Sequence, residues 1–255
     1  LRRRGHLLEA PLGVAAGPHT QLSQNLVAAW LCGARYLELK TVQVRDDLEI
    51  PRPCIDMADE GYNCEWSQEL SIAASADQYL DAWIAIRILQ QEAGCLDPSE
   101  PGFVMDLSVG YDLAGIKSAK VGRFLDRMTS SRSEFERRFA AAAALHPHAG
   151  HIPPAERLAD SVTLSTMHGC PPEEIERIAT FLLEERGLHT TVKLNPTLLG
   201  AREVRSLLND ALGYRAIVPD EAFARDLTWD AALDLIASLR STAARAGRSF
   251  GVKLT

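Results

Sequence analysis

Short, continuous apolar runs alternate with longer segments of helical periodicity along most of the chain. Buried parallel strands read as such runs, and strands that alternate with helices are typical of βα units on a parallel sheet. Six runs fit this description, and they cover residues 11–16, 36–42, 103–109, 162–165, 190–194 and 249–254. The pattern therefore predicts an α/β fold built around a parallel sheet.

Helical spacing of apolar residues fills much of the space between these runs. Four helices are predicted, over residues 22–31, 77–91, 172–185 and 229–246. In the first, the shared apolar face consists of Leu22, Leu26, Val27, Trp30 and Leu31. Gly33 is the residue type that ends such a helix, and Thr228 is the type that caps the start of the last one.

Two architectures fit this pattern: an open doubly wound sheet and a closed (β/α)8 TIM-type barrel. The segment Gly13–Gly17 lacks the Gly-x-Gly-x-x-Gly spacing of a dinucleotide-binding sheet, which favours the barrel. A length of 255 residues suits one barrel domain. The chain starts without Met and ends at Thr255 inside a predicted strand. We therefore expect residues 1–255 to form a single, incomplete barrel domain, truncated after about six strands.

Composition narrows the class of protein. A net charge of -7 argues against nucleic acid as a partner, and no apolar run approaches the roughly 20 residues that span a membrane. Five cysteines at irregular spacing suit a reducing, cytoplasmic compartment, and no Cys-x-x-Cys motif indicates a cluster or zinc site. Residues 140–158 are predicted to be a surface insertion. Its His146, His148 and His151 lack a neighbouring acid or cysteine, so no metal site is predicted.

Lysines inside the apolar runs are the most informative chemical signal. Lys40, Lys193 and Lys253 each lie near the end of a predicted strand, and the carboxyl ends of strands form the active site of a barrel. An unpaired buried ammonium costs several kcal/mol, so an anion is expected to face at least some of them. The alternative is that each lysine extends to solvent or pairs with an acid such as Asp106.

Two loops after predicted strands add candidate residues. Ala15, Ala16 and Gly17 would let a flat ligand approach the backbone, although a tight turn has the same composition. Residues 165–172 place a hydroxyl, an imidazole and a thiol close together, as acid–base or nucleophilic chemistry requires, but a well-capped loop contains the same groups. Residues 45–66 form a polar stretch too long for a plain connection, and loops of that length are usually functional.

Six motifs resemble the amino-terminal region of the selenate reductase flavoproteins. They are GVAAGPH at 13–19, ELKTVQ at 38–43, DLSVGY at 106–111, LSTMHGCPP at 164–172, VKLNPTLLG at 192–200 and FGVKLT at 250–255. That region in turn resembles the dihydroorotate dehydrogenase barrel. The resemblance spans essentially the whole chain and implies a flavin-dependent oxidoreductase that acts on a small-molecule substrate together with other subunits of a redox complex.

The resemblance assigns an FMN site to the strand ends. It implies that FMN contacts Ala15, Ala16, Gly17, Lys40, Thr41, Asn63, Lys193, Asn195 and Lys253. A fixed cation suits this ligand, because reduced flavin gathers negative charge at its N1–C2 carbonyl edge. In the family, FAD, NAD(P)H and 4Fe-4S clusters belong to a further region that this chain does not encode, and the strands that usually hold the flavin phosphate would also lie beyond Thr255.

One motif departs from the dehydrogenase pattern. Where those enzymes carry a Cys or Ser base, the aligned residue is Thr166, and the two pyrimidine-binding asparagines become Thr163 and His168. Threonine is a poor base, so dihydropyrimidine oxidation is not expected. His168 or Cys170 could take over proton transfer. Two rival hypotheses stay open: a Schiff-base lyase or aldolase that uses Lys193 or Lys40, and a non-catalytic docking barrel.

Overall fold

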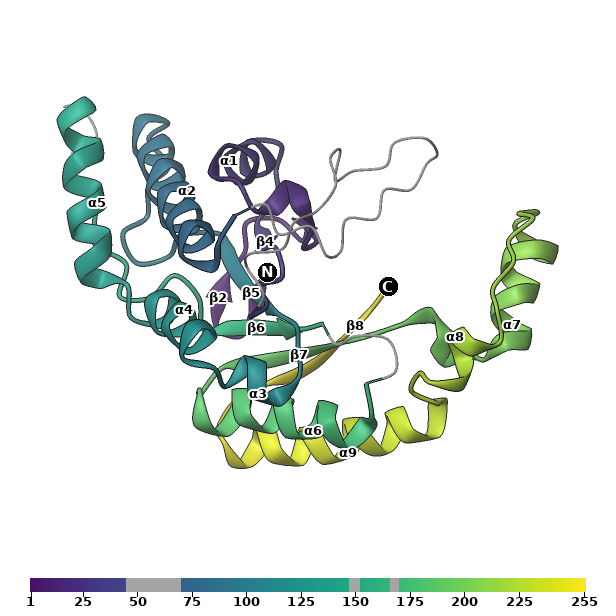
Figure 1. The fold of residues 1–255 in the computed structure, drawn as a ribbon. Helices are drawn as coiled ribbons and strands as arrows, with labels where there is room; N and C mark the ends of the chain where they lie inside the picture. The colour runs from purple at the N-terminus through teal and green to yellow at the C-terminus, as the bar shows by residue number, and fades with distance from the viewer. Residues whose placement is uncertain (45–69, 147–151, 166–169) are drawn as a thin grey trace. The chain divides into compact units, whose positions relative to one another are not determined.

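The computed structural model describes residues 1–44, 70–146, 152–165 and 170–255. The chain divides into two compact units (Figure 1). Unit 1 comprises Leu1–Ser108 and Lys117–Asp160, and unit 2 comprises Val109–Ile116 and Ser161–Thr255. Each unit contains parallel strands with helices packed against them, as the alternation of apolar runs predicts.

The sheet of unit 1 contains three parallel strands in the order β3-β4-β5. These strands are β3 (Gly13–Val14), β4 (Tyr36–Glu38) and β5 (Val104–Val109). All of β5 is buried, which explains its continuous apolar reading. Backbone bonds from Leu39 to Asp106 and from Val42 to Ser108, both 2.9 Å, extend the pairing of β4 with β5 past Glu38. The first three predicted strands are thus confirmed, with shorter bounds for the first two.

Gly13 allows β3 and β4 to approach closely. A Cβ atom at this position would lie 2.4 Å from the carbonyl oxygen of Tyr36, which is fixed backbone. Any larger residue would therefore push the two strands apart at the point where the sheet of unit 1 begins.

Four longer helices accompany this sheet. They are α1 (Ser23–Leu31), α2 (Ile72–Glu92), α4 (Ala119–Thr129) and α5 (Arg132–Leu145), and a short 3-10 turn, η1 (Pro18–Thr20), precedes α1. Gly33 has a φ of 101° just past α1, as its predicted role at the helix end requires. Leu26 and Trp30 are buried, but Leu31 is 65% exposed, so the apolar face of α1 is narrower than predicted.

Sequence analysis did not predict α4 or α5. The buried residues of α4 are Val121, Phe124, Leu125 and Met128, which have regular amphipathic spacing. Ser118 caps its first turn by accepting a hydrogen bond from the amide of Val121. Helix α5 includes residues 140–145, so the predicted surface insertion at 140–158 starts within a helix. Its His148 and His151 lie outside the described residues.

A short antiparallel hairpin begins unit 1. It consists of β1 (Arg2–Arg3) and β2 (His6–Leu7), joined through Arg4 and Gly5, both with positive φ. Arg3 stacks on the ring of Tyr36, with its guanidinium carbon 4.5 Å from the ring centroid. This contact holds the hairpin against β4. Its strands have only two residues each, which is too short for an apolar run that the sequence could show.

Unit 2 contains three parallel strands in the order β6-β7-β8. They are β6 (Ser161–Leu164), β7 (His189–Leu194) and β8 (Phe250–Leu254), close to the predicted bounds. The accompanying helices are α3 (Leu113–Ile116), α6 (Pro172–Thr180), which continues as the π-helical turn η3 (Phe181–Glu185), and α9 (Trp229–Arg245). Thr228 caps α9 as predicted, because its side chain accepts a hydrogen bond from the amide of Ala231.

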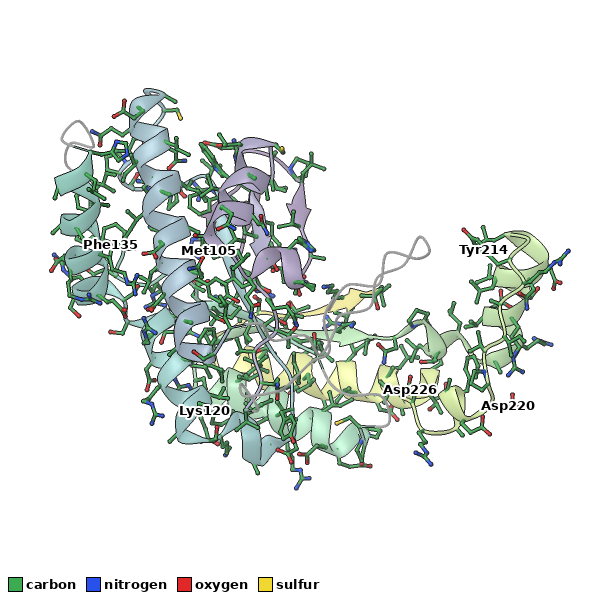
Figure 2. The ribbon with its side chains drawn as sticks, turned by 45° about the horizontal axis from the view of Figure 1, so that its top comes forward. Met105, Lys120, Phe135, Tyr214, Asp220 and Asp226 are labelled. Carbon is green, nitrogen blue, oxygen red and sulfur yellow. The ribbon has the colours of Figure 1, made fainter. Side chains whose placement is uncertain are left out.

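An arm of short helices connects β7 to α9 within unit 2 (Figures 1 and 2). It contains η4 (Pro196–Leu199), α7 (Ala201–Arg205), the π-helical turn η5 (Ser206–Ala211) and α8 (Glu221–Ala224). Tyr214 and Asp220, labelled in Figure 2, belong to this arm. Within it, the guanidinium of Arg205 in α7 donates a 2.6 Å hydrogen bond to the carbonyl of Val218, which precedes α8.

Among the residues described, none of the helices combines the length and the apolar character needed to cross a lipid bilayer.

Candidate strand-end site

The loop after β3 is held by a buried acid on the neighbouring strand. The amide of Ala16 donates a hydrogen bond of 3.1 Å to the Glu38 carboxylate, and Glu38 is only 4% exposed. The amide of Gly17 bonds to the Thr20 hydroxyl at 3.1 Å, and that hydroxyl donates in return to the Gly17 carbonyl at 3.0 Å. Ala15 is exposed, and Ala16 and Gly17 are half-buried. The loop therefore has a fixed backbone with small side chains.

Gly17 is small for a reason other than the predicted one. Its backbone is extended, with φ -173° and ψ 177°, so its conformation is open to any residue. A Cβ atom there would instead lie 2.7 Å from the ring of His19. A larger residue at this position would need the exposed His19 ring to turn aside, and the backbone conformation itself does not require glycine.

Lys40 follows β4 at the same edge of the unit 1 sheet. It is 4% exposed, which confirms that this lysine is buried as the sequence predicts. Its carbonyl accepts a hydrogen bond from the Tyr79 hydroxyl at 3.3 Å, and its amide bonds to the Thr20 carbonyl at 3.4 Å. The next residue, Thr41, shares a 2.8 Å hydrogen bond with the hydroxyl of Ser108 at the end of β5. The backbone around Lys40 is thus fixed from both sides.

Asp106 is a second buried acid on these strands, and an arginine of the hairpin pairs with it. Asp106 is the register partner of Glu38, and its side chain is fully buried. The guanidinium of Arg4 contacts its carboxylate at 3.3 Å, and the Tyr36 side chain hydrogen-bonds to the same carboxylate. Burial, and then the charge of Asp106, raise the pKa of Tyr36 well above its ordinary value. Tyr36 therefore stays protonated and serves Asp106 as a hydrogen-bond donor.

In unit 2, one face of the sheet is polar near its carboxyl ends. Thr163, Thr191 and Gly251 occupy aligned positions on β6, β7 and β8, and the Cβ position of Gly251 lies 3.5 Å from the Thr191 hydroxyl. Two residues further along, Lys193 and Lys253 are direct register partners. Neighbouring strands lie about 4.8 Å apart, so both lysine side chains leave the sheet side by side on this polar face. Two like charges so placed favour an anion between or above them.

Lys193 also lines a small cavity together with Cys170 and Asn195. The cavity measures about 20 Å³, which is room for about one water molecule. Its wall includes Thr197, whose hydroxyl donates a 2.6 Å hydrogen bond to Asp226. The structure thus brings together three predicted site residues. It adds Asp226, which lies 33 positions from Lys193 in an arm without a recognisable motif.

Burial raises the pKa of the Cys170 thiol to about 11, and the charges of Glu174 and Asp112 act in the same direction. A thiol in this state is protonated near neutral pH. It is therefore a weak nucleophile, and the same high pKa makes it a poor proton donor near neutral pH, so the proton-transfer role of Cys170 stays a prediction.

Three of the predicted site residues, Asn63, Thr166 and His168, lie outside the described residues. Their assignments stay predictions. The remaining nine belong to two sets that each lie within one unit: Ala15, Ala16, Gly17, Lys40 and Thr41 in unit 1, and Cys170, Lys193, Asn195 and Lys253 in unit 2.

Comparison with known proteins places the whole chain in one family. Residues 1–255 match the family described as "Oxidoreductase YgfK, N-terminal TIM-barrel domain". The proteins named "Putative oxidoreductase YgfK" in Escherichia coli strain K12 and in Escherichia coli O157:H7 are each 42% identical over 275 aligned positions, which cover 98% of this chain and 26% of the relative. The chain thus spans about a quarter of the length of these curated relatives.

A solved structure described as a putative phosphonomutase from Burkholderia cenocepacia J2315 is 12% identical, covers 88% of this chain and 62% of its own, and has a TM-score of 0.29. That likeness is too low to carry an argument. The family match confirms the TIM-type barrel over the doubly wound sheet. By that match and by its identity to the two Escherichia coli relatives, the chain belongs to the family of N-terminal TIM-barrel domains of the YgfK oxidoreductases.

Proposed function

We propose that this domain binds FMN at its strand ends and passes electrons between a small-molecule substrate and FAD and iron–sulfur centres elsewhere in a longer polypeptide or complex. The proposal includes membership of the selenate reductase flavoproteins, on the motif resemblance described above. The observation that carries it is the placement of Lys193 and Lys253 in register on a polar strand face.

The residues of unit 1 fit a flavin in shape and charge. A loop of small residues has its backbone fixed by Glu38, and the buried Lys40 lies on the next strand at the same sheet edge. A flat ring needs close approach to backbone, and its reduced form needs a cation whose position does not change on reduction. Ala15, Ala16 and Gly17 would allow the ring to approach the backbone. Lys40, with Thr41 beside it, would supply the fixed cation.

The residues of unit 2, taken by themselves, fit an anionic or electron-rich ligand such as FMN. Lys193 and Lys253 would bind an electron-rich or anionic edge, and Asn195 would add a neutral hydrogen-bonding group. When bound, FMN would supply the electron-carrying chemistry. Cys170, which lines the same small cavity as Lys193, would face the substrate as a neutral thiol.

The test is cofactor content and affinity in the full-length protein. We expect extraction to release FMN, and Lys193→Met to weaken FMN binding by at least tenfold or to lower the flavin reduction potential, because the cation that stabilises the anionic reduced ring is lost. Lys193→Arg should recover part of either property. Lys117→Met, which removes an exposed lysine between α3 and α4, is the matched control and should change neither.

Other outcomes distinguish the rival functions. A full-length protein that contains no FMN but still binds its partner subunits would support the docking barrel. Trapping of a carbonyl substrate on Lys193 or Lys40 by borohydride would support a Schiff-base lyase. Unchanged FMN affinity and potential in Lys193→Met would remove Lys193 from the site.

A further inference from the structure

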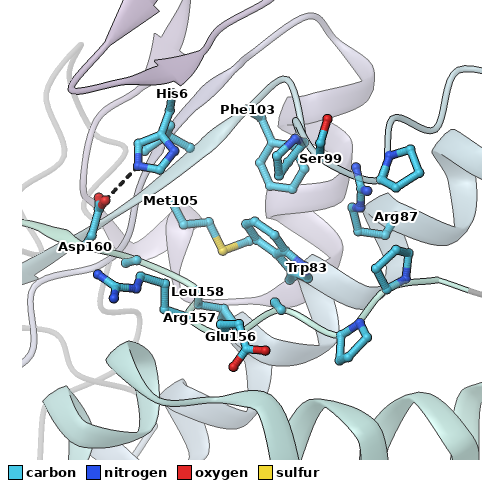
Figure 3. Close-up of a pocket in the computed structure, with 17 residues that line it drawn as sticks. His6, Trp83, Arg87, Ser99, Phe103, Met105, Glu156, Arg157, Leu158 and Asp160 are labelled. Carbon is cyan, nitrogen blue, oxygen red and sulfur yellow. Dashed lines mark hydrogen bonds and ion pairs between the residues drawn. The ribbon is translucent and has the colours of Figure 1, made fainter.

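One cavity of unit 1 lies away from the strand-end residues. It is lined by Met105, labelled in Figure 3, and by Val104, both at the beginning of β5. Lys40, by contrast, follows the end of β4, and Ser108 lies near the end of β5. Its volume is about 220 Å³, enough for several water molecules or a small organic molecule. Because active sites of barrels form at the carboxyl ends of strands, a ligand here would be distinct from the proposed flavin.

One wall of this cavity is aromatic and apolar. The rings of Trp83 and Phe103 lie 4.8 Å apart between centroids at an interplanar angle of 50°. The sulfur of Met105 points toward Trp83, and Leu158 lies beside them (Figure 3). Aromatic faces and a polarisable thioether favour a flat apolar partner.

Arg87 supplies a buried positive charge to the same cavity. Its side chain extends from α2, and the residue is 3% exposed. Its guanidinium donates to the side-chain oxygen of Gln90 at 2.7 Å and to the backbone carbonyl of Asp97 at 2.5 Å, and both acceptors are neutral. Within the described part of the chain it makes no ion pair with a carboxylate, and burial lowers its pKa. A buried cation with only neutral acceptors is costly, and an anionic ligand would offset that cost.

Among the acids around the cavity, Asp97 acts on Arg87 through its charge without forming an ion pair with it. Asp160 pairs with His6 at 2.7 Å, and Glu156 pairs with Arg132. The Asp97 carboxylate accepts hydrogen bonds from the amides of Ser99 and Glu100 and from the Ser99 hydroxyl. The acids near the cavity are therefore engaged elsewhere, while the exposed Arg157 adds a second cation at its rim.

We propose that this cavity binds a small aromatic carboxylate, with the carboxylate on Arg87 and the ring against Trp83, while Met105 stays buried in the wall. The planar guanidinium matches a carboxylate in a two-point contact, and the aromatic wall favours an acid that also carries a ring over a free inorganic anion. The volume is below the roughly 300–1,000 Å³ of sites for drug-sized ligands, so the ligand is a single-ring acid. This binding does not depend on the strand-end site or on FMN.

The experiment uses benzoate as the probe and methionine methyl resonances of the full-length protein as the readout. Met105 lies in the cavity, whereas Met128 is buried in α4 and serves as the internal control. Benzoate should shift the Met105 methyl resonance in a saturable way and leave Met128 unchanged. Benzamide has the same ring without the charge and should bind at least tenfold more weakly, which is about 1.4 kcal/mol. Inorganic phosphate should not compete.

Two variants isolate the guanidinium. Arg87→Met should weaken benzoate binding at least tenfold and leave benzamide binding unchanged, whereas Arg137→Met, which removes a 71% exposed arginine of α5, should change neither. Loss of the native Met128 resonance in Arg87→Met would mean that this variant does not fold. The test would then rest on the ratio of benzoate to benzamide affinity in the unmodified protein. Equal binding of benzoate and benzamide, absence of a saturable Met105 shift, or undiminished benzoate binding in folded Arg87→Met would overturn the proposal.

Discussion

In unit 1, acids and bases are brought together around the strands, whereas in unit 2 two bases occupy neighbouring strand positions. Asp106 on β5 is paired with Arg4 from the hairpin, and Glu38 on β4 accepts the amide of Ala16. Lys193 and Lys253 instead align on β7 and β8. Like charges on neighbouring strands repel each other, so an anionic ligand would stabilise this arrangement.

The difference separates charges that support structure from charges that suit a ligand. A buried ion pair such as Arg4–Asp106 fixes the hairpin on the sheet, and removal of one partner leaves an uncompensated charge. Two aligned lysines gain most when an anion neutralises both. The structural role is therefore strongest in unit 1, and the ligand role is expected to be strongest in unit 2.

The largest effect is expected from Arg4→Met. This variant leaves the fully buried Asp106 carboxylate without its cation, and breaking a buried pair costs about 3–5 kcal/mol. Amide hydrogen exchange of a peptide that covers β5 should therefore accelerate more than a hundredfold in the full-length protein. Replacing both partners, as in Arg4→Met with Asp106→Leu, should restore most of the protection.

Arg2→Met is the matched control for this experiment. Arg2 forms an exposed ion pair with Glu100 at 2.7 Å, and surface pairs contribute only about 0–1 kcal/mol. Exchange from β5 should hardly change. If β5 exchanged no faster in Arg4→Met than in Arg2→Met, the charge of Asp106 would be compensated by other groups. The claim that the Arg4–Asp106 pair stabilises unit 1 would then be wrong.

A smaller effect of opposite sign is expected in unit 2. Lys253→Met removes one of two aligned cations, so in ligand-free protein the pairing of β7 with β8 should keep its stability or gain about 0.2–1 kcal/mol. Exchange of a peptide that covers β7 should be equal or slower, and FMN binding should be weaker. Faster exchange from β7 in ligand-free Lys253→Met would mean that the lysine stabilises the sheet. The claim that the aligned lysines of unit 2 serve a ligand would then be wrong.

The strands were predictable because each is a short run rich in apolar or β-branched residues and bounded by polar or turn residues. The hairpin was missed because its strands have two residues each and no apolar run. Helix α4 could have been found from the spacing of Val121, Phe124, Leu125 and Met128, whereas the arm between β7 and α9 consists of helices too short for periodicity to show.

The site was predictable only as far as local sequence determines it. Burial of Lys40 and the position of Lys193 and Lys253 near strand ends followed from the predicted strands, whereas the direct alignment of Lys193 with Lys253 depends on strand register. The pairing of Arg4 with Asp106 joins positions 102 residues apart, and the contact of Ala16 with Glu38 depends on strand register, so neither leaves a motif. The cavity around Arg87 likewise depends on tertiary packing of segments that carry no motif of their own.

The smallest effect concerns a half-exposed pair in the same hairpin as Arg4. The hydrogen bond between His6 and Asp160, at 2.7 Å, raises the pKa of His6 above 6.5. The charges of Asp160 and Glu100 also raise this pKa, whereas burial and the charge of Arg157 lower it. Because the folded form holds the proton more tightly than the unfolded form, this stabilisation is complete below pH 6.5 and is lost as pH rises through the raised value. The protection factor of the Leu8 amide, which bonds to the carbonyl of Leu1 at 2.8 Å, should therefore fall by about two- to fivefold between pH 6 and pH 8.5, a small change because solvent screens a half-exposed pair. His6→Gln should remove this pH dependence and leave exchange from β5 unchanged. A Leu8 protection factor that is constant with pH in the unmodified protein, or that rises, would show that the hairpin is held by Arg4 and Arg3 alone.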